Sequence, residues 1–258
     1  MIPPPTTLAE GRPVHDLAGV RVWLVTADEP ARRRLQPLLA PDELTRAGRL
    51  RNAADRDRFV VGRGLARLAL ATQLGIAPAA VALRTGAHGR PALGCETLDF
   101  NIAHAGALVA CAVARDQRVG IDVEHLRVLR ARHAFVELTC APHERAWLES
   151  LPRRARKAAL FELWTAKEAC LKASGCGLLE PPSEVAVVLR PGRERLPART
   201  LARFREERFA VHRLACPSDY RLTLATRPRR AAAAAPAGDP TARRPLRSSG
   251  SRRRADRA

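Results

Sequence analysis

Two acidic side chains interrupt an otherwise apolar stretch, VGIDVEHLR at residues 119–127, which reads as a buried strand. Because side chains alternate along a strand, Asp122 and Glu124 are predicted to project from the same face, roughly 7 Å apart. Two like charges in such positions repel each other unless a cation lies between them. One solution is a divalent cation such as Mg²⁺, which prefers oxygen ligands. The other is a pair of surface acids that bind Arg118 and Arg127.

A second stretch, FELWTAKEACLKASGCGL at residues 161–178, has the periodicity of a helix. Glu168 and Lys172 are four residues apart and therefore share one helix face, with a tryptophan one turn earlier. This arrangement is typical of a helix-stabilising ion pair, but it also presents a carboxylate and an amine to a ligand. If Glu168 comes close to Asp122 and Glu124 in the fold, three carboxylates would complete a magnesium site.

Basic side chains elsewhere could bind a phosphate-rich ligand. The planar guanidinium of arginine fits phosphate oxygens, and a histidine can donate a hydrogen bond to a pyrophosphate. In so arginine-rich a chain, each of them also fits the description of a solvated surface residue. The candidates are Arg46, Arg49, Arg58, Arg63, Arg90 and His104.

The composition indicates a globular protein. The chain has 258 residues, 46% of them hydrophobic, which is enough for one large domain or two small ones. The N-terminus lacks the pattern of a signal peptide and no segment holds ~18 uninterrupted apolar residues, so we expect a cytoplasmic protein that does not span a membrane. The six cysteines lack metal-finger spacing and are expected to be reduced thiols.

The net charge of +19 is unevenly distributed along the chain. Residues 227–258 hold ten arginines and two aspartates, which gives +8 and leaves +11 for residues 1–226. This last segment is low in complexity and almost free of large apolar residues, so it is predicted to be a disordered tail. It could act as a polyanion-binding arm or be a solvated extension.

The elements that must position the acids follow from the hydrophobic pattern. Residues 20–24 alternate as a strand, and residues 53–74 form a long helix with one apolar and one basic face. Strands at 107–113 and 118–124, joined by a polar turn, are predicted to form a hairpin. Further helices are predicted over 131–150 and 155–175, and strands over 184–190, 208–215 and 220–227.

This order of elements predicts an α+β fold with two similar halves that meet near residue 120. We therefore expect an N-terminal subdomain at 1–119 that carries phosphate-binding residues and a C-terminal subdomain at 120–226 that carries the acids. The tail at 227–258 would follow them.

Three ordered motifs strongly resemble the Sfp-type 4'-phosphopantetheinyl transferases. They are FNIAHAGALVACAV at 100–113, VGIDVE at 119–124 and LWTAKEACLKASGCGL at 163–178. The resemblance covers about residues 20–225 and excludes the tail. It implies two similar α/β halves with the active site between them. It also implies an enzyme that transfers the 4'-phosphopantetheine arm of coenzyme A to a serine of an apo acyl or peptidyl carrier protein and releases adenosine 3',5'-bisphosphate.

The resemblance also implies roles for individual residues. Asp122, Glu124 and Glu168 match the family's Mg²⁺ ligands, and Glu168 matches its proposed base toward the acceptor serine. Lys172 and His104 match residues that face the phosphates and support catalysis. The full set of implied coenzyme A contacts is Arg46, Arg58, Arg63, Arg90, His104, Lys167 and Lys172.

Two positions depart from the family pattern: Ala103 stands where a serine is common, and Glu43 where a basic residue is expected. Two rival functions remain open on the residues alone. A nucleic-acid-binding protein would explain the charge, and a metal-dependent nuclease or phosphodiesterase would use the same acids. The resemblance favours a monomer whose partners are coenzyme A and a carrier protein, with no specific nucleic acid and no membrane.

Overall fold

The computed structural model describes residues 13–17, 19–86, 90–95, 97–129, 132–176 and 180–229. The elements of the N-terminal half are β1 (His15–Leu17), β2 (Val20–Thr26), α1 (Glu29–Leu35), α2 (Pro41–Gly48), α3 (Ala53–Leu74), β3 (Leu83–Thr85), β4 (Pro91–Leu93), β5 (Leu98–Ala105) and β6 (Leu108–Arg115). Those of the C-terminal half are β7 (Gln117–His125), α4 (Arg132–Thr139), α5 (Pro142–Ser150), α6 (Arg153–Ser174), β8 (Ala186–Val187), β9 (Arg199–Phe204), β10 (Glu207–Leu214) and β11 (Tyr220–Pro228).

The two halves repeat one topology. Strand β2 of the first half and strand β7 of the second are each followed, further along the chain, by a helix of 22 residues, α3 or α6. An antiparallel strand pair then follows, β5 with β6 in the first half and β10 with β11 in the second. In the first sheet β6 lies between β2 and β5, and in the second β11 lies between β7 and β10. The full sheet orders are β1-β2-β6-β5 and β7-β11-β10-β9-β8. This repetition confirms the predicted α+β fold of two similar halves, and the chain passes from one half to the other just before β7.

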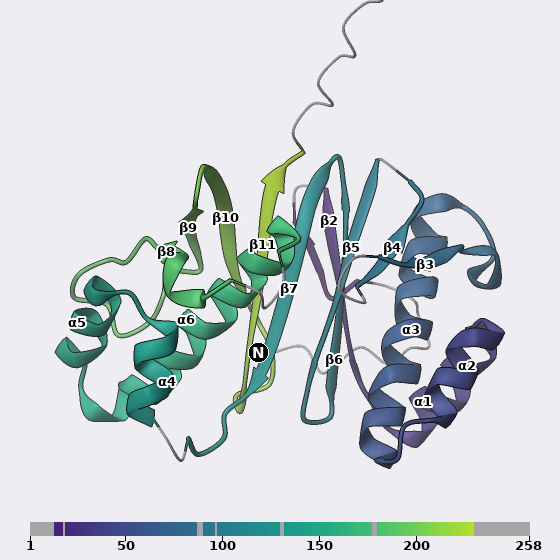
Figure 1. Cartoon of the computed structure of the whole chain (residues 1–258), viewed down its shortest axis with the longest axis horizontal. Helices are drawn as coiled ribbons and strands as arrows, with labels where there is room; N and C mark the ends of the chain where they lie inside the picture. Colours follow the sequence, from purple (N-terminus) through teal and green to yellow (C-terminus); the bar gives the residue numbers. More distant parts are fainter. Residues whose placement is uncertain are drawn as a thin grey trace, which may run out of the picture.

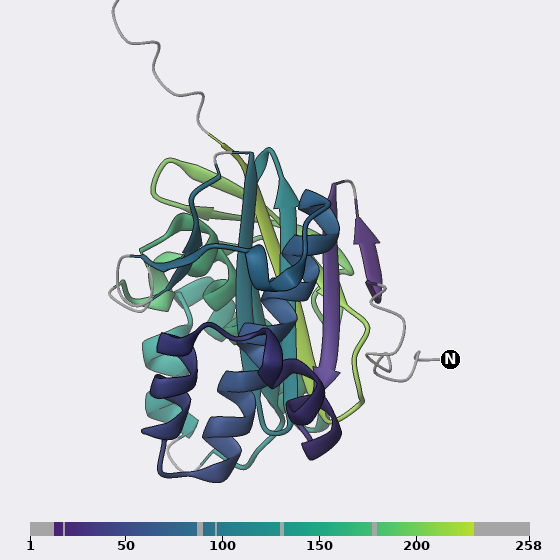
Figure 2. The same cartoon turned by 90° about the vertical axis from the view of Figure 1, so that its right-hand side faces the viewer.

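The halves stack as four layers, with helices outside and the two sheets inside (Figure 1). Apolar side chains of β2 and β6 meet those of β7 and β11 in a core between the sheets, where Val22 and Ile121 are fully buried. A second core lies between the first sheet and α3, and a third between the second sheet and α6. Figure 2 shows α1, α2 and α3 together in front of the N-terminal sheet.

The hairpin predicted for residues 107–124 is wrong. Strand β6 pairs with β2 and β5, whereas β7 pairs with β11 in the other sheet. The chain crosses between the sheets at Asp116, which has a φ of 56°. Two apolar strands joined by a short polar turn give the same sequence pattern whether they hydrogen-bond side by side or stack face to face. The hairpin that does form is β5–β6, which turns at Gly106 with a φ of 54°.

Among the other elements, the long helix matches the expectation and three points need correction. The long helix predicted at 53–74 is α3, which starts at the cap Asn52 and ends at Gly75 with a φ of 67°. The helix predicted at 131–150 is two helices, because Pro142 starts α5. Strand β9 was not predicted. Strand β11 continues to Pro228, so the predicted tail begins inside the sheet, and its residues 230–258 lie outside the described part of the chain.

Within the described residues, no helix combines the length and the apolar character needed to cross a membrane. All six cysteines are free thiols, as predicted. Three of them, Cys111, Cys140 and Cys170, are completely buried.

Candidate active site

The acidic pair lies on the face of β7 that packs against α6. The Lys172 ammonium donates to Asp122 Oδ1 at 2.6 Å and to the Ile121 carbonyl at 3.2 Å. About two turns earlier on the same helix, the Trp164 indole N–H donates to Glu124 Oε1 at 3.1 Å. Both carboxylates therefore face the helix, as the alternation along the strand predicts.

Gly120 allows α6 to approach β7 closely enough for these contacts. A Cβ atom at this position would lie 2.0 Å from the Ala169 carbonyl oxygen, 2.6 Å from the Ala173 nitrogen and 2.9 Å from Lys172 Cβ. These are backbone atoms of the helix for the most part, so they cannot move aside as the end of a side chain can. The glycine of the VGIDVE motif thus allows the short distance between α6 and β7 that brings Lys172 and Glu168 near the acids.

Glu168 is the third carboxylate of the site. It is 5% exposed, and its Oε1 atom is buried without a hydrogen-bond partner. Burial and the charges of Asp122 and Glu124 raise the pKa of Glu168 to about 7, although Lys172 acts against them. The Oδ2 atom of Asp122 is also buried without a partner, and burial raises the pKa of Asp122 to about 6. The two unpaired carboxylate oxygens belong to one electrostatic cluster, in which burial and mutual repulsion disfavour the ionised forms.

The alternative expectation, surface acids paired with arginines, is met in part. Arg127 donates to Glu124 Oε2 at 2.7 Å, whereas Arg118 lies 3.9 Å from Asp99 and away from the pair. In the described part of the chain, no group of three or more His, Cys, Asp or Glu side chains is arranged so that it could hold a metal ion. In this conformation Lys172 binds Asp122, while Trp164 and Arg127 bind Glu124, so the carboxylates do not converge on one point.

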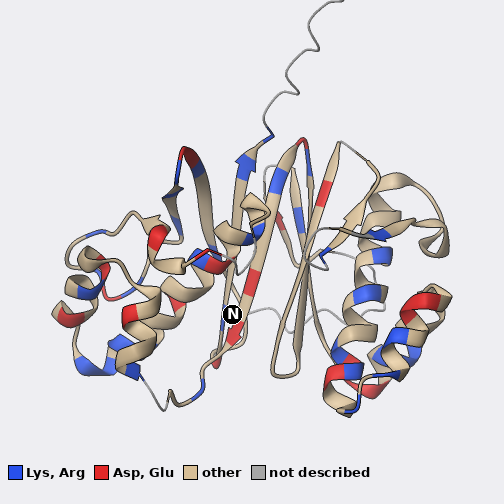
Figure 3. Cartoon of the chain, viewed as in Figure 1, with Lys and Arg blue, Asp and Glu red and all other residues tan. Residues whose placement is uncertain are grey.

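His104 borders the same region from the N-terminal half. It lies exposed near the end of β5. Neighbouring atoms still enclose part of the ring, and this partial burial, together with the positive charges of Arg58 and Lys172, lowers the pKa of His104. The three groups therefore belong to one basic cluster. Arg58 is held by the Gly106 carbonyl at 2.9 Å and by Asp55. In Figure 3, blue bands of basic residues run along α3, while red bands mark the acids of β7.

Arg46 and Arg63 form a second basic group beside the first. Their guanidinium groups lie 5.3 and 5.5 Å from the centre of the Phe59 ring. Glu43, the residue found where the family pattern has a base, is 7% exposed. It pairs with Arg67 at 3.0 Å and accepts from the Ala40 N–H at the start of α2. Glu43 therefore stabilises the fold at this position.

Lys167 is a correction to the predicted coenzyme A contacts. Its side chain is completely buried, and its ammonium pairs with the equally buried Glu144 at 2.7 Å. The carbonyls of Pro182 and Val185 accept its remaining hydrogen bonds, at 3.1 and 2.5 Å. Adjacent helix residues point about 100° apart. Lys167 is therefore turned away from Glu168, into the C-terminal core beside Glu144. It ties α5 and the segment before β8 to α6.

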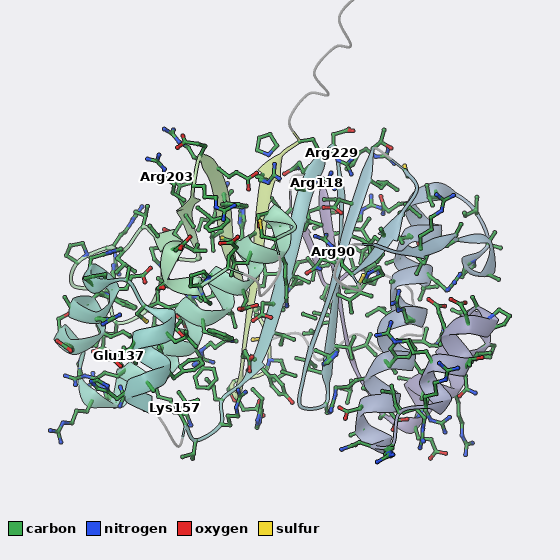
Figure 4. All side chains as sticks on the ribbon, in the orientation of Figure 1. Arg90, Arg118, Glu137, Lys157, Arg203 and Arg229 are labelled. Atoms are coloured by element: carbon green, nitrogen blue, oxygen red, sulfur yellow. The ribbon has the colours of Figure 1, made fainter. Side chains whose placement is uncertain are left out.

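Arg90, expected among the coenzyme A contacts, is bound by the protein itself. Its guanidinium donates to a carboxylate, that of Asp99, and to three backbone carbonyls, so protein acceptors occupy both terminal nitrogens. Figure 4 shows its side chain between the two halves, below Arg118 and Arg229. A cavity of ≈ 490 Å³ opens beside it, lined by these three arginines and by residues such as Pro91, Asp99 and Gly175.

Comparison with known proteins identifies the family. Residues 28–116 match the family model described as 4'-phosphopantetheinyl transferase, N-terminal, and residues 118–225 match the 4'-phosphopantetheinyl transferase superfamily. The chain is 35% identical to the 4'-phosphopantetheinyl transferase HetI of Nostoc sp. over 179 residues, which cover 67% of this chain and 75% of the relative. This chain belongs to the 4'-phosphopantetheinyl transferase superfamily.

More distant relatives agree with this membership. A putative 4'-phosphopantetheinyl transferase of Synechocystis sp. is 32% identical over 61% of this chain and 65% of its own length. The 4'-phosphopantetheinyl transferase Sfp of Bacillus subtilis is 24% identical over 66% of this chain and 77% of its own. The predicted family is confirmed, and with it the predicted enzyme class, a coenzyme A-dependent 4'-phosphopantetheinyl transferase.

Sequence reasoning missed two residues that hold the site together. Asp99 and Asn101 of β5 are 9% and 5% exposed and bind backbone N–H groups of β7. In the stretch LDFNIAH they alternate with apolar residues, which is the pattern of side chains that face a second layer. That alternation could have singled them out.

Proposed function

We propose that Asp122, Glu124 and Glu168 hold Mg²⁺ in this transferase. The observation that carries the proposal is the pair of buried carboxylate oxygens, Asp122 Oδ2 and Glu168 Oε1, which lack a hydrogen-bond partner. Oxygen donors of this kind suit a hard divalent cation. Glu124, 18% exposed at its side chain, would exchange its contact with Arg127 for the metal. When bound, Mg²⁺ would neutralise charge on the pyrophosphate of coenzyme A.

The protein groups then act on the serine of a carrier protein. The serine oxygen attacks the β-phosphorus of coenzyme A, a new P–O bond forms, and the bond to the bridging oxygen of the pyrophosphate breaks. Glu168 accepts the serine proton. The electron pair leaves with adenosine 3',5'-bisphosphate.

Basic residues on both halves would bind the phosphates of coenzyme A. Lys172 donates to Asp122 at 2.6 Å and would stabilise the charge that develops on the leaving group, and His104 lies within the electrostatic range of Lys172. Arg58 lies in the same basic cluster as His104. Arg46, which is exposed beside Phe59, would bind a more distant phosphate. Arg63 contacts the same ring but is 9% exposed and lies 3.8 Å from Glu43, so it would support Arg46 from below the surface. A guanidinium offers the planar donor pair that phosphate oxygens require.

The second substrate is an apo acyl or peptidyl carrier protein. Residues 1–226 carry a net charge of +11, which would steer an acidic carrier domain toward the enzyme. The proposed chemistry is complete within one copy of the chain. It requires neither a nucleic acid nor a membrane.

Intact-mass measurement of apo carrier proteins tests this function. With the full chain, Mg²⁺ and coenzyme A, we expect at least one of a panel of fatty-acid, polyketide and nonribosomal-peptide carriers to gain one phosphopantetheine group. Glu168→Gln should abolish the gain, whereas Glu137→Gln, an exposed acid on α4 labelled in Figure 4, should not. Unchanged masses across the panel would refute the proposal. A wild-type rate in Glu168→Gln would refute the role of Glu168.

A further inference from the structure

The guanidinium of Arg90 joins three elements that belong to both halves of the molecule. One terminal nitrogen donates to the Lys172 carbonyl on α6. The other donates to the Phe100 carbonyl on β5 at 2.8 Å and to the Val119 carbonyl on β7 at 3.2 Å. Asp99 accepts from the same nitrogen at 3.2 Å and neutralises the charge. Few of its donors remain for a ligand.

These contacts lie at the seam where the edges of the two sheets meet. Strands β5 and β7 do not pair as a ladder, and side chains make the contact instead. Asp99 Oδ2 accepts from the Val119 N–H at 2.9 Å, and Asn101 Oδ1 accepts from the Ile121 N–H at 2.9 Å. Arg90 therefore binds the Asp99 carboxylate, which already accepts a hydrogen bond from β7. Through the Lys172 carbonyl, Arg90 also connects the end of α6 to this network.

The Lys172 carbonyl is one of the last of α6, which ends at Ser174. Carbonyls in the last turn of a helix lack partners within the helix and attract positive charge. Arg90 supplies both the donor and the charge. The side chain of Lys172 donates from its ammonium to Asp122 at 2.6 Å. Arg90 of the N-terminal half therefore fixes the main chain of Lys172, while the Lys172 side chain reaches the acids of the C-terminal half.

We propose that Arg90 is a positioning residue that locks the two halves together and fixes Lys172 over the acids, and that it is not a ligand of the coenzyme A phosphates. This inference rests on the proposed function for the role of Lys172 alone. It makes a chemical distinction that can be tested. A lysine can replace an arginine as a point charge for phosphate, but a single ammonium cannot reproduce a planar fork that reaches α6, β5 and β7 at once.

The test is a double-mutant cycle with Arg90→Lys and Lys172→Ala in the full chain. We expect Arg90→Lys to lower kcat/KM for coenzyme A by about tenfold to a hundredfold, the loss typical of a misplaced catalytic group. In the Lys172→Ala background the same change should cost less than about threefold, because the residue it positions is gone. Arg118→Gln, which removes an exposed charge from the same cavity, should leave kcat/KM unchanged.

Three results would overturn the inference. Near-wild-type activity of Arg90→Lys would show that a point charge suffices, as for a phosphate ligand. Equal losses from Arg90→Lys in both backgrounds would show that it acts independently of Lys172. If Arg90→Lys does not fold, Asp99→Asn replaces it in the cycle, and equal losses from Asp99→Asn in both backgrounds would count against the inference in the same way. Wild-type activity of Lys172→Ala would instead refute the role of Lys172 in the proposed function.

Discussion

Glu168 combines two properties that oppose each other, burial and charge. Its unpaired Oε1 atom and the nearby Asp122 and Glu124 make the ionised form unfavourable in the metal-free protein, which is why its pKa rises to about 7. A raised carboxyl pKa means that the folded state binds a proton more tightly than the unfolded state. The ionised group therefore destabilises the fold above pH about 7, and this cost disappears as the pH falls toward the ordinary pKa.

Glu168→Gln should therefore stabilise the metal-free protein while it abolishes transfer. At about pH 8 we expect the free energy of unfolding to rise by about 1–3 kcal/mol, because the amide removes a buried charge. At about pH 5 the difference should shrink to near zero, since wild-type Glu168 is then protonated. Chemical denaturation with a chelator present measures both values. A Glu168→Gln variant less stable than wild type at the higher pH would contradict the unpaired-charge account.

The acids and the basic residues of the site differ in how well sequence reasoning predicted them. Asp122, Glu124, Glu168 and Lys172 were recognised from spacing and family resemblance, and the structure brings them together. Lys167 matched the same motif, yet its ammonium is enclosed by Glu144 and two carbonyls. A motif gives residue types in order along the chain, but it does not say on which side of a helix the partners of each residue lie.

At the scale of elements, the site depends on how closely α6 approaches β7. The contact is as tight as a glycine permits, with a virtual Cβ of Gly120 only 2.0 Å from the Ala169 carbonyl oxygen. Long helices and apolar strands were predicted well, because their periodicity extends over many residues. The stacking of β6 on β7 was not predicted. Which strands pair depends on contacts between residues far apart in sequence, such as those that pair β7 with β11.

Gly120→Ala should destabilise the protein and impair transfer together. The added methyl group would clash with backbone atoms of α6, so we expect a loss of about 1–3 kcal/mol in the free energy of unfolding. Gly48→Ala is the matched control, since a Cβ there would meet nothing within 4 Å, and it should change stability by less than about 0.5 kcal/mol. Urea denaturation and the transfer rate report the two effects. Equal stability of both variants would contradict the proposed role of the close contact.

At the scale of the whole molecule, the proposed site draws its residues from both repeated halves. The acids come from the C-terminal half, and His104, Arg58, Arg46 and Arg63 come from the N-terminal half. The two-half architecture was predictable from the order of elements and from the family motifs. The side-chain network at the seam, Arg90 with Asp99 and Asn101, was not, because each contact joins residues of different elements or different halves.

The basic body predicts that carrier recognition depends on salt. Raising the ionic strength from about 0.05 to about 0.5 M shortens the range of electrostatic steering. We therefore expect KM for an acidic carrier to rise severalfold, while kcat changes little. Steady-state kinetics at saturating coenzyme A measure both parameters. A KM that is constant over this range would show that the net charge of +11 in residues 1–226 does not guide the carrier.

The central claim is that Asp122, Glu124 and Glu168 together hold a divalent cation, and binding of Mn²⁺ tests it most directly. Mn²⁺ replaces Mg²⁺ at oxygen sites, and electron paramagnetic resonance counts free Mn²⁺ in the presence of coenzyme A without any carrier, so no turnover is needed. We predict one bound Mn²⁺ per chain in the wild type and in Glu137→Gln, and a loss of binding in Asp122→Asn. Equal Mn²⁺ binding by wild type and Asp122→Asn, or none by the wild type, would contradict the claim.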